Sequence, residues 1–249
     1  MKKKITIIVP TYNNPHELES TLDSIMNFSH LFDLHIIDSS TFYPLNFKHK
    51  NVLLNSSKWI KPSGVYDAIN EGINLCKTSY LMTLNSGDTA NTQNLKEAII
   101  SDVYNCSQNL DIIIGAQDMV YKNIFYKEIP SLLSIWPHQS VIYKRELHDE
   151  FGYFSSNYKI ISDQVFFEKI KNIKKLLIKF NNNSLTTYDI TGISSIMNRK
   201  SLKEYKILNK LRGKNNLKLY LRYYFYKLCD MLQLDFHLFW HSLRAKLKK

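Results

Sequence analysis

Three short polar segments come directly after apolar runs of the chain. They are Pro10-Thr11-Tyr12, Asp38-Ser39-Ser40 and Asn85-Ser86-Gly87-Asp88. Carboxylate, amide and hydroxyl oxygens of this kind bind a hard divalent cation or hydrogen-bond a polar ligand. A run that is apolar enough to be buried and then ends in such groups predicts a ligand site at its end.

The part of the chain before about residue 198 alternates β-branched runs with helical segments. The predicted strands cover residues 5–9, 34–38, 51–54, 80–84 and 111–115. This alternation predicts an α/β domain with a mostly parallel sheet flanked by helices. Ligands of such sheets bind beyond the carboxyl ends of the strands, so the three polar segments should converge on one rim.

Helix signals separate these strands. Asn14 should cap a helix in which Pro15 is the first residue and Glu17 the third, as in a capping box. Its apolar stripe is Leu18, Leu22 and Ile25. A second helix over residues 64–77 should bury Val65, Ile69, Ile73 and Cys76 on one face, and a third covers residues 95–104.

Common nucleotide-binding loops are missing from the sequence. It has neither GxGxxG nor GxxxxGK[ST], and only 7 glycines, which argues against nicotinamide-dependent redox enzymes and P-loop ATPases. Cys76, Cys106 and Cys229 are widely spaced and odd in number, as expected for reduced thiols in a cytoplasmic protein. The basic start is followed by an apolar run too short for a signal peptide, and we predict no membrane-spanning segment.

The net charge of +11 is concentrated in the last 51 residues. Residues 199–249 contain 14 basic and 3 acidic side chains, whereas the first 198 residues contain 19 of each. This split predicts a neutral domain over residues 1–198 and a basic helical tail over residues 199–249.

The tail has the pattern of an amphipathic helix. Its apolar residues recur at helical spacing at Leu217, Leu221, Tyr224, Leu228 and Met231, and Phe236, Phe239, Trp240, Leu243 and Leu247 continue the series. A basic, aromatic helix of this kind is typical of an anchor on an anionic membrane leaflet. The alternative is a helix packed on the domain with solvated lysines.

In order and spacing, four segments of the chain resemble motifs of the family 2 glycosyltransferases. They are residues 7–13, 37–41, 64–73 and 84–88. The match runs from residue 5 to about 195 and is closest to the branch that serves bacterial surface polysaccharides. It implies the Rossmann-like A-type nucleotide-sugar fold and an inverting transfer from a nucleoside diphosphate sugar, for which we expect UDP.

The resemblance also implies a donor site. Pro10, Thr11 and Tyr12 would line the nucleoside pocket, and Asp38 would hydrogen-bond the base. Asp67 and Asn70 would add to this site, as would Asn85, Ser86 and Gly87, which stand in the Asp-x-Asp-type signature. Asp88 is the one carboxylate left in that signature and would bind Mn²⁺ or Mg²⁺, which neutralises charge on the leaving diphosphate.

An inverting transfer needs a base for the acceptor hydroxyl. The resemblance assigns this role to Asp163, within Ile161-Ser162-Asp163-Gln164, with Ser162 as the expected helix cap. It places His138 and Gln139 at the start of the acceptor-side loop and Ser194 in the segment that closes over the diphosphate. These three residues are candidates for binding acceptor or phosphate.

Other interpretations stay open. Asp88 could be a turn residue, Asp38 a strand-end cap, Asp163 a helix cap, His138 a structural residue, and Asn70 a partner for backbone groups. Two further classes of function are a catalytically inactive nucleotide-sugar-binding partner and a nucleic-acid-binding protein that stacks bases on Tyr223, Tyr224 and Tyr226.

From the sequence we therefore expect a hexosyl- or N-acetylhexosaminyltransferase for polysaccharide biosynthesis, such as O-antigen or capsule. Its partners would be a nucleotide-sugar donor, a lipid-linked saccharide acceptor and the inner leaflet of the membrane, and no nucleic acid. It would be cytoplasmic and peripherally bound to the membrane.

Overall fold

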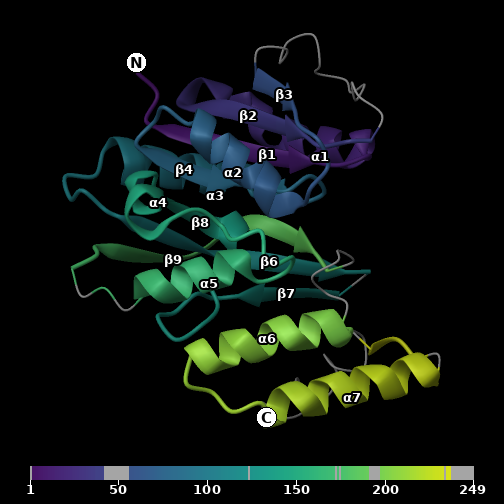
Figure 1. Ribbon diagram of the computed structural model, residues 1–249. Coiled ribbons are helices and arrows are strands. Elements are labelled where there is room, and N and C mark those ends of the chain that lie inside the picture. The colour runs from purple at the N-terminus through teal and green to yellow at the C-terminus, as the bar shows by residue number, and fades with distance from the viewer. Residues whose placement is uncertain are drawn as a thin grey trace.

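The computed structural model describes residues 2–41, 56–122, 124–171, 173, 175–190, 197–232 and 234–236. Within these ranges nine strands form one sheet in the order β3-β2-β1-β4-β8-β6-β9-β5, with β7 added beside β6 (Figure 1). The strands are β1 (Ile5–Thr11), β2 (Phe32–Asp38), β3 (Ser57–Trp59), β4 (Tyr80–Thr83), β5 (Thr89–Ala90), β6 (Ile112–Tyr121), β7 (Ile124–Glu128), β8 (Val141–Lys144) and β9 (Ile178–Asp189).

The helices are α1 (Pro15–Ile25), α2 (Val65–Leu75), α3 (Thr92–Ala98), α4 (Glu146–Phe151), α5 (Ser162–Lys171), α6 (Arg199–Leu211) and α7 (Leu217–Met231). Short 3₁₀ segments cover Met26–Leu31 and His138–Ser140, and α3 continues as a π-helix over Ile99–Tyr104. No helix among the described residues is both long enough and apolar enough to cross a membrane.

Only the N-terminal half of the sheet is parallel throughout. There β1 lies between β2 and β4, and β3 continues the parallel order beyond β2. In the other half, β8 pairs antiparallel with β4 and β6, while β6 and β9 run parallel. The α/β architecture is as predicted, and the antiparallel strands come from the second half of the domain, where we predicted only one strand.

Successive residues of β1 point to opposite faces of the sheet, and each face has its own core. Ile7 and Val9 pack with α1 and α3, whereas Ile8 packs with α2, α4 and α5. Every residue of β1 is buried, as expected for a central parallel strand. The result is a sheet with helices on both faces.

The predicted helices form with some differences at their ends. Asn14 caps α1 by accepting the N–H of Glu17, and Pro15 is the first helical residue. Val65 is 41% exposed because it begins α2, while Ile69 and Ile73 further along are buried. Ser162 is the first residue of α5 and its hydroxyl donates to the Ser155 carbonyl, so it is not the helix cap we predicted.

Two predicted strand ends also differ. We expected Pro10 to end the first strand, but β1 continues to Thr11, because Pro10 still offers a carbonyl to the N–H of Ser86 at 3.1 Å. The predicted strand over residues 51–54 lies outside the described residues.

The basic tail begins with α6, which packs on α5, while α7 lies on the outer side of α6 (Figure 1). The predicted amphipathic helix is present as α7, and all five residues of its apolar stripe are exposed, from 45% at Leu228 to 72% at Met231. The part of the stripe after residue 236 lies outside the described residues. Thus α7 carries an apolar face that the described part of the chain does not cover.

Gly72 allows α2 to approach β1 closely. A Cβ atom on Gly72 would lie 2.3 Å from Cγ2 of Ile8. Gly72→Ala should therefore lower the free energy of unfolding by about 1–3 kcal/mol through overpacking, as measured by urea denaturation. Adding Ile8→Ala opens the space, so the double variant should lose less than the sum of the single losses. Additive losses would contradict this contact.

Candidate active site

The three polar segments meet at the carboxyl ends of β2, β1 and β4. Thr11 lies opposite Asp38 in the β1–β2 register, and the N–H of Ser86 donates to the carbonyl of Pro10. The end of β1 therefore has the Asp38 segment on one side and the Asn85–Asp88 segment on the other. The rim predicted from the sequence is present.

Asp38 belongs to a tightly bonded corner. Its carboxylate is 5% exposed and accepts the N–H of Ser40 at 2.8 Å, while the Ser40 hydroxyl accepts the N–H of Asn13 at 2.8 Å. Asn13 adopts a left-handed conformation with φ of 55°, which asparagine tolerates better than most residues. Tyr12, beside it, is 56% exposed. The corner is rigid and presents an aromatic ring to a ligand.

Two hydroxyl groups at the rim are buried without a hydrogen-bond partner among the described residues. They are Oγ1 of Thr11 and Oγ of Ser86. Buried polar groups in native proteins are nearly always paired. A ligand seated on the rim would supply the missing partners.

Asp88 is buried beside the same strand end. Its Oδ2 accepts Nε2 of Gln139 at 3.1 Å and the carboxylate also accepts the backbone N–H of Asp189. Burial, with a smaller contribution from the charge of Asp189, raises the pKa of Asp88 to about 7, against the lowering effects of Gln139, His138 and the N–H of Asp189. Thr21 on α1 fixes the turn by donating to the Asp88 carbonyl at 2.7 Å.

Asp163 and His138 form a hydrogen-bonded pair across the rim from Asp88. Oδ2 of Asp163 lies 2.8 Å from Nδ1 of His138, and Oδ1 accepts the hydroxyl of Tyr66 at 2.6 Å. The other imidazole nitrogen, Nε2, lies 3.2 Å from Nδ2 of Asn85. The predicted base, the predicted acceptor-side histidine and the signature segment therefore form one network.

Known glycosyltransferases are similar to this chain in sequence and in fold. No protein-family model matches the chain. Among curated relatives, it is similar to TarP of Staphylococcus aureus strain N315, a poly(ribitol-phosphate) β-N-acetylglucosaminyltransferase. The identity is 28%, and the match covers 86% of this chain and 66% of TarP. This relative supports the resemblance to the family 2 glycosyltransferases that the motifs indicate.

Solved structures of family-related proteins show the same A-type fold. One is the 1–349 fragment of S. aureus TarS in complex with UDP-GlcNAc, 16% identical with a TM-score of 0.58, covering 84% of this chain and 65% of that one. Another is glucosyl-3-phosphoglycerate synthase from Mycobacterium tuberculosis with Mn²⁺ and UDP-glucose, 13% identical with a TM-score of 0.55, covering 86% and 81%. The chain thus spans about two thirds of the length of TarP and of the TarS fragment.

The structure explains one departure from the family signature. Gly87, which replaces an acid, has a φ of 99°, and a Cβ atom there would lie 3.3 Å from Oε2 of Glu17. An aspartate at this position would combine backbone strain with repulsion from a second carboxylate. Asp88 is therefore the acid that this turn can present.

The donor set fits the divalent cation that the family fold implies. Among the described residues, no group of three His, Cys, Asp or Glu side chains surrounds a common point. Mg²⁺ and similar cations need only one or two carboxylates when phosphates and water complete the shell. Asp88 would hold the cation, and Asp189 is the second acid close enough to act on its charge. No sequence motif marks Asp189, whose only signal is its place at the end of β9.

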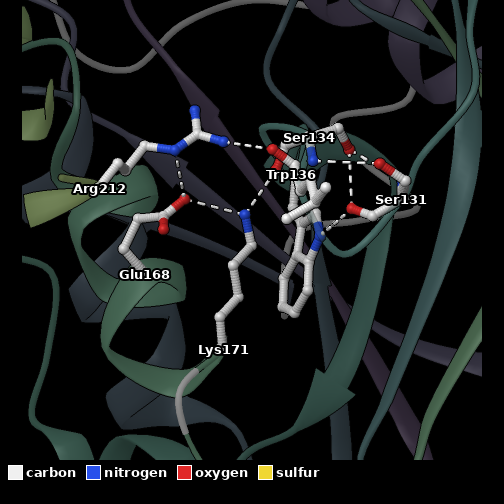
Figure 2. Close-up of polar contacts among 7 residues, drawn as sticks. Ser131, Ser134, Trp136, Glu168, Lys171 and Arg212 are labelled. Atoms are coloured by element: carbon white, nitrogen blue, oxygen red, sulfur yellow. Dashed lines mark hydrogen bonds and ion pairs between the residues drawn. The ribbon is translucent and has the colours of Figure 1, made fainter. Parts of the chain in front are cut away.

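The loop that leads to His138 is braced against α5 and α6 (Figure 2). Lys171 donates to the carbonyl of Ser134, lies 4.6 Å from the ring centre of Trp136 and pairs with Glu168 at 2.9 Å. Arg212, just after α6, contacts Glu168 at 3.3 Å and donates to the carbonyl of Leu133. The contacts to Leu133, Ser134 and Trp136 hold the loop whose end carries the imidazole, and Glu168 pairs with both cations.

The remaining predicted site residues have other surroundings. Asn70 makes two hydrogen bonds with the backbone of Phe154, at 2.8 and 3.0 Å. This agrees with the alternative interpretation that Asn70 is a partner for backbone groups. Asp67 lies in the first turn of α2 beside Gly64, whose other neighbour is the ammonium of Lys159. The side-chain amide of Gln139 donates to Asp88 and does not stand free to bind an acceptor. Ser194 lies outside the described residues.

Tyr66 is a site residue that we did not predict. It sits one place before Asp67 in a family motif, but its buried hydroxyl reaches Asp163, 97 residues away. Burial, and then the charge of Asp163, raise the pKa of Tyr66 well above its usual value. Tyr66 therefore stays a hydrogen-bond donor to this carboxylate at all physiological pH values.

The raised pKa of Asp88 predicts a conflict between stability and function. Since the folded protein keeps the Asp88 proton up to a pH of about 7 and the unfolded chain loses it near 3.8, the free energy of unfolding should fall as pH rises through this interval. Asp88→Asn removes the effect and should stabilise the ligand-free protein at pH 8 by up to about 4 kcal/mol, with little effect at pH 4.

Urea denaturation of both proteins between pH 4 and 8 measures this difference. Asp149→Asn is the control, because Asp149 is exposed and paired with Arg145. A stability gain at Asp88→Asn that is the same at every pH would contradict the burial argument.

Proposed function

We propose that this chain is an inverting glycosyltransferase that moves N-acetylglucosamine from UDP-GlcNAc to a hydroxyl of a polyol-phosphate polymer held on a lipid carrier. The observation that carries the proposal is the shared rim of Asp38, the unpartnered Thr11 and Ser86 hydroxyls, Asp88, and the Asp163–His138 pair. The name of TarP supports the sugar and the polymer. The TarS complex with UDP-GlcNAc supports the donor.

The proposed donor lies along the rim. Asp38 would accept the N–H of uracil, and the exposed ring of Tyr12 would stack on the base. The hydroxyls of Thr11 and Ser86 would bond the ribose and diphosphate. Asp88 would hold Mn²⁺ or Mg²⁺, which as a Lewis acid lowers the cost of charge on the departing UDP.

The Asp163–His138 pair would face the reacting carbon. An inverting displacement brings the acceptor hydroxyl to the side of C1 opposite the leaving diphosphate, and a base on that side takes the proton. The family resemblance assigns the base to Asp163, and the network with His138 and Tyr66 supports a proton-accepting role for this region of the rim.

The donor assignment predicts specific losses. Wild-type protein should be stabilised by UDP-GlcNAc with Mn²⁺ more than by GDP-mannose, and should release UDP. Asp38→Asn replaces one carboxylate oxygen by an amide N–H₂ and removes the negative charge, so the side chain accepts the N–H of the base less well and UDP affinity should drop about 10- to 100-fold. Thermal shift and isothermal titration measure both effects.

Two other experimental outcomes would indicate a different function. Binding of UDP-GlcNAc without UDP release, with or without acceptor, would support an inactive nucleotide-sugar-binding partner. A salt-dependent shift with oligonucleotides and none with UDP-sugars would support nucleic-acid binding.

We further propose that the tail contacts the inner leaflet of the membrane. The exposed stripe of α7 and the excess of basic residues after 198 match an anionic lipid surface. Leu133, 83% exposed, lies near the turn between α6 and α7, because its carbonyl is bonded by Arg212 at the end of α6. A lipid-linked acceptor would then reach the rim from the membrane.

Vesicle sedimentation tests this contact. The protein should bind vesicles that contain phosphatidylglycerol and not vesicles of phosphatidylcholine alone. Leu221→Glu with Leu228→Glu should abolish binding, whereas Gln108→Glu with Asn109→Asp, which adds the same charge on an exposed loop of the domain, should weaken it only slightly. Equal losses in the two double variants would show that charge alone is responsible and that the apolar stripe has no part.

A further inference from the structure

The hydroxyl of Tyr66 faces two hydrogen-bond acceptors. Its oxygen lies 2.6 Å from Oδ1 of Asp163 and 2.9 Å from the carbonyl oxygen of Ile160. A phenol has one proton to donate, and burial keeps this proton on Tyr66 because it raises the pKa of the phenol well above its usual value. The single proton therefore points to one acceptor or the other, and the charge of Asp163 decides which.

The ionised carboxylate is the stronger of the two acceptors. A hydrogen bond to a charged group is about twice as strong as one between neutral groups, so the Tyr66 proton points to Asp163 while this residue is ionised. Once Asp163 has gained a proton, its carboxyl oxygen is a weak neutral acceptor, and the amide carbonyl of Ile160 is the stronger one. The second acceptor thus keeps the buried hydroxyl bonded in both protonation states of Asp163.

The backbone around Ile160 is held by two other elements. Glu204 on α6 is 6% exposed and accepts the N–H groups of Lys159 and Ile160, at 3.0 and 2.8 Å. The ammonium of Lys159 donates to the carbonyl of Ser63, just before α2. The segment that carries the second acceptor is therefore anchored both to the tail and to the start of the helix that carries Tyr66.

We propose that Tyr66 is a positioning residue that serves both protonation states of Asp163, the base of the proposed reaction. Before transfer, the phenol donates to Oδ1 and favours the ionised carboxylate. In the transfer step the acceptor oxygen bonds to C1 of the sugar, the bond from C1 to the diphosphate oxygen breaks, and UDP leaves with the electron pair. The acceptor proton goes to the Asp163 carboxylate and is later lost to water, while the Tyr66 proton turns to Ile160. This inference rests on the proposed transferase function.

Several titratable groups face Asp163 in the described part of the chain. They are Tyr66 on α2, His138 on the 3₁₀ segment, Tyr143 on β8 and Tyr205 on α6. Nδ1 of His138 donates to Oδ2 of Asp163 in the neutral and in the protonated ring alike, since a carboxylate can only accept. Burial raises the pKa of Tyr143 and of Tyr205 above the usual value, so both phenols are uncharged near neutral pH. A change at Tyr66 therefore acts on the carboxylate through its hydrogen bond.

Tyr66→Phe tests the role of the hydroxyl. The variant keeps the ring that packs against Phe154, with 5.7 Å between ring centres, so the fold should persist. A donor to the charged form favours that form, so without it the low-pH limb of kcat should move up by about one to two pH units. The loss of kcat should be about 10-fold or more at pH 5 and should shrink toward pH 8.

UDP release from UDP-GlcNAc measures this profile. Both proteins are compared at saturating UDP-GlcNAc and Mn²⁺, which removes the titration of Asp88 from the comparison. KM and the thermal stabilisation by UDP should stay unchanged, because Tyr66 acts through the base and not on the donor.

Tyr143→Phe is the matched control. Tyr143 lies in the same apolar core as Tyr66, and its hydroxyl bonds Nε2 of His148 at 2.9 Å instead of Asp163. The control should also lose thermal stability, but its kcat profile should keep the wild-type position on the pH axis. A purely structural loss lowers kcat by the same factor at every pH.

A second test needs no turnover. In the Asp163→Asn background the side chain beside the Tyr66 hydroxyl is neutral, so Tyr66→Phe should lower the melting temperature less than it does in wild type. In the turnover assay the double variant should be no slower than Asp163→Asn alone, since Tyr66 acts through Asp163.

Each other outcome contradicts the proposal. An unmoved kcat profile in Tyr66→Phe, multiplied losses of kcat in the double variant, or equal losses of melting temperature in the two backgrounds would overturn it. Loss of UDP stabilisation in Tyr66→Phe would place Tyr66 in donor binding, which also overturns it. A wild-type protein that releases no UDP would instead refute the transferase function, and the inference would fall with it.

Discussion

The parallel pairing of β1 with both β2 and β4 is the constraint on which the rest of the structure depends. It brings three strand ends, separated by long stretches of sequence, to one edge in a fixed register. Because β1 is the middle strand, its last residues meet the Asp38 segment on one side and the Asn85–Asp88 segment on the other. Backbone bonds from Ser39 to Thr11 and from Ser86 to Pro10 extend the pairing beyond the strands. The place of the proposed sugar nucleotide on this rim follows from the register before any side chain is considered.

Burial of the Asp88 carboxylate at this sheet edge is unfavourable in free energy. The sheet buries the carboxylate, and burial opposes its charge strongly enough to raise its pKa to about 7. Two donors, from Gln139 and the backbone of Asp189, recover only part of that cost. A cation and a diphosphate would recover the rest, and they would also supply partners for the Thr11 and Ser86 hydroxyls. We therefore expect ligand binding to stabilise the rim, as is common at functional sites.

Sequence reasoning found the parts of the fold that are set locally. The strands β1, β2 and β4, the Asn14 cap of α1 and the helix α7 each follow from short patterns of burial, capping or periodicity. It failed where partners lie far apart in the chain. Tyr66 and Asp163 are 97 residues apart, and no sequence pattern around either residue predicts their contact. The antiparallel pairing of β8 and the proximity of Asp189 to Asp88 likewise depend on how the second half of the chain returns to the sheet.

The basic tail shows the same dependence on distant contacts, and its acids explain why it is not a loose appendage. Glu204 on α6 is 6% exposed and accepts the N–H groups of Lys159 and Ile160, in the segment that leads into α5 and Asp163. Asp235 bonds the Tyr121 hydroxyl at 2.8 Å at the far end of β6. Two of the three acids after residue 198 thus face the domain, where they hold α6 and the segment beyond α7, while the third, Asp230 on α7, is exposed and pairs with Lys227. Glu204 thereby ties α6 of the tail to the backbone segment that leads into Asp163, which in turn contacts His138.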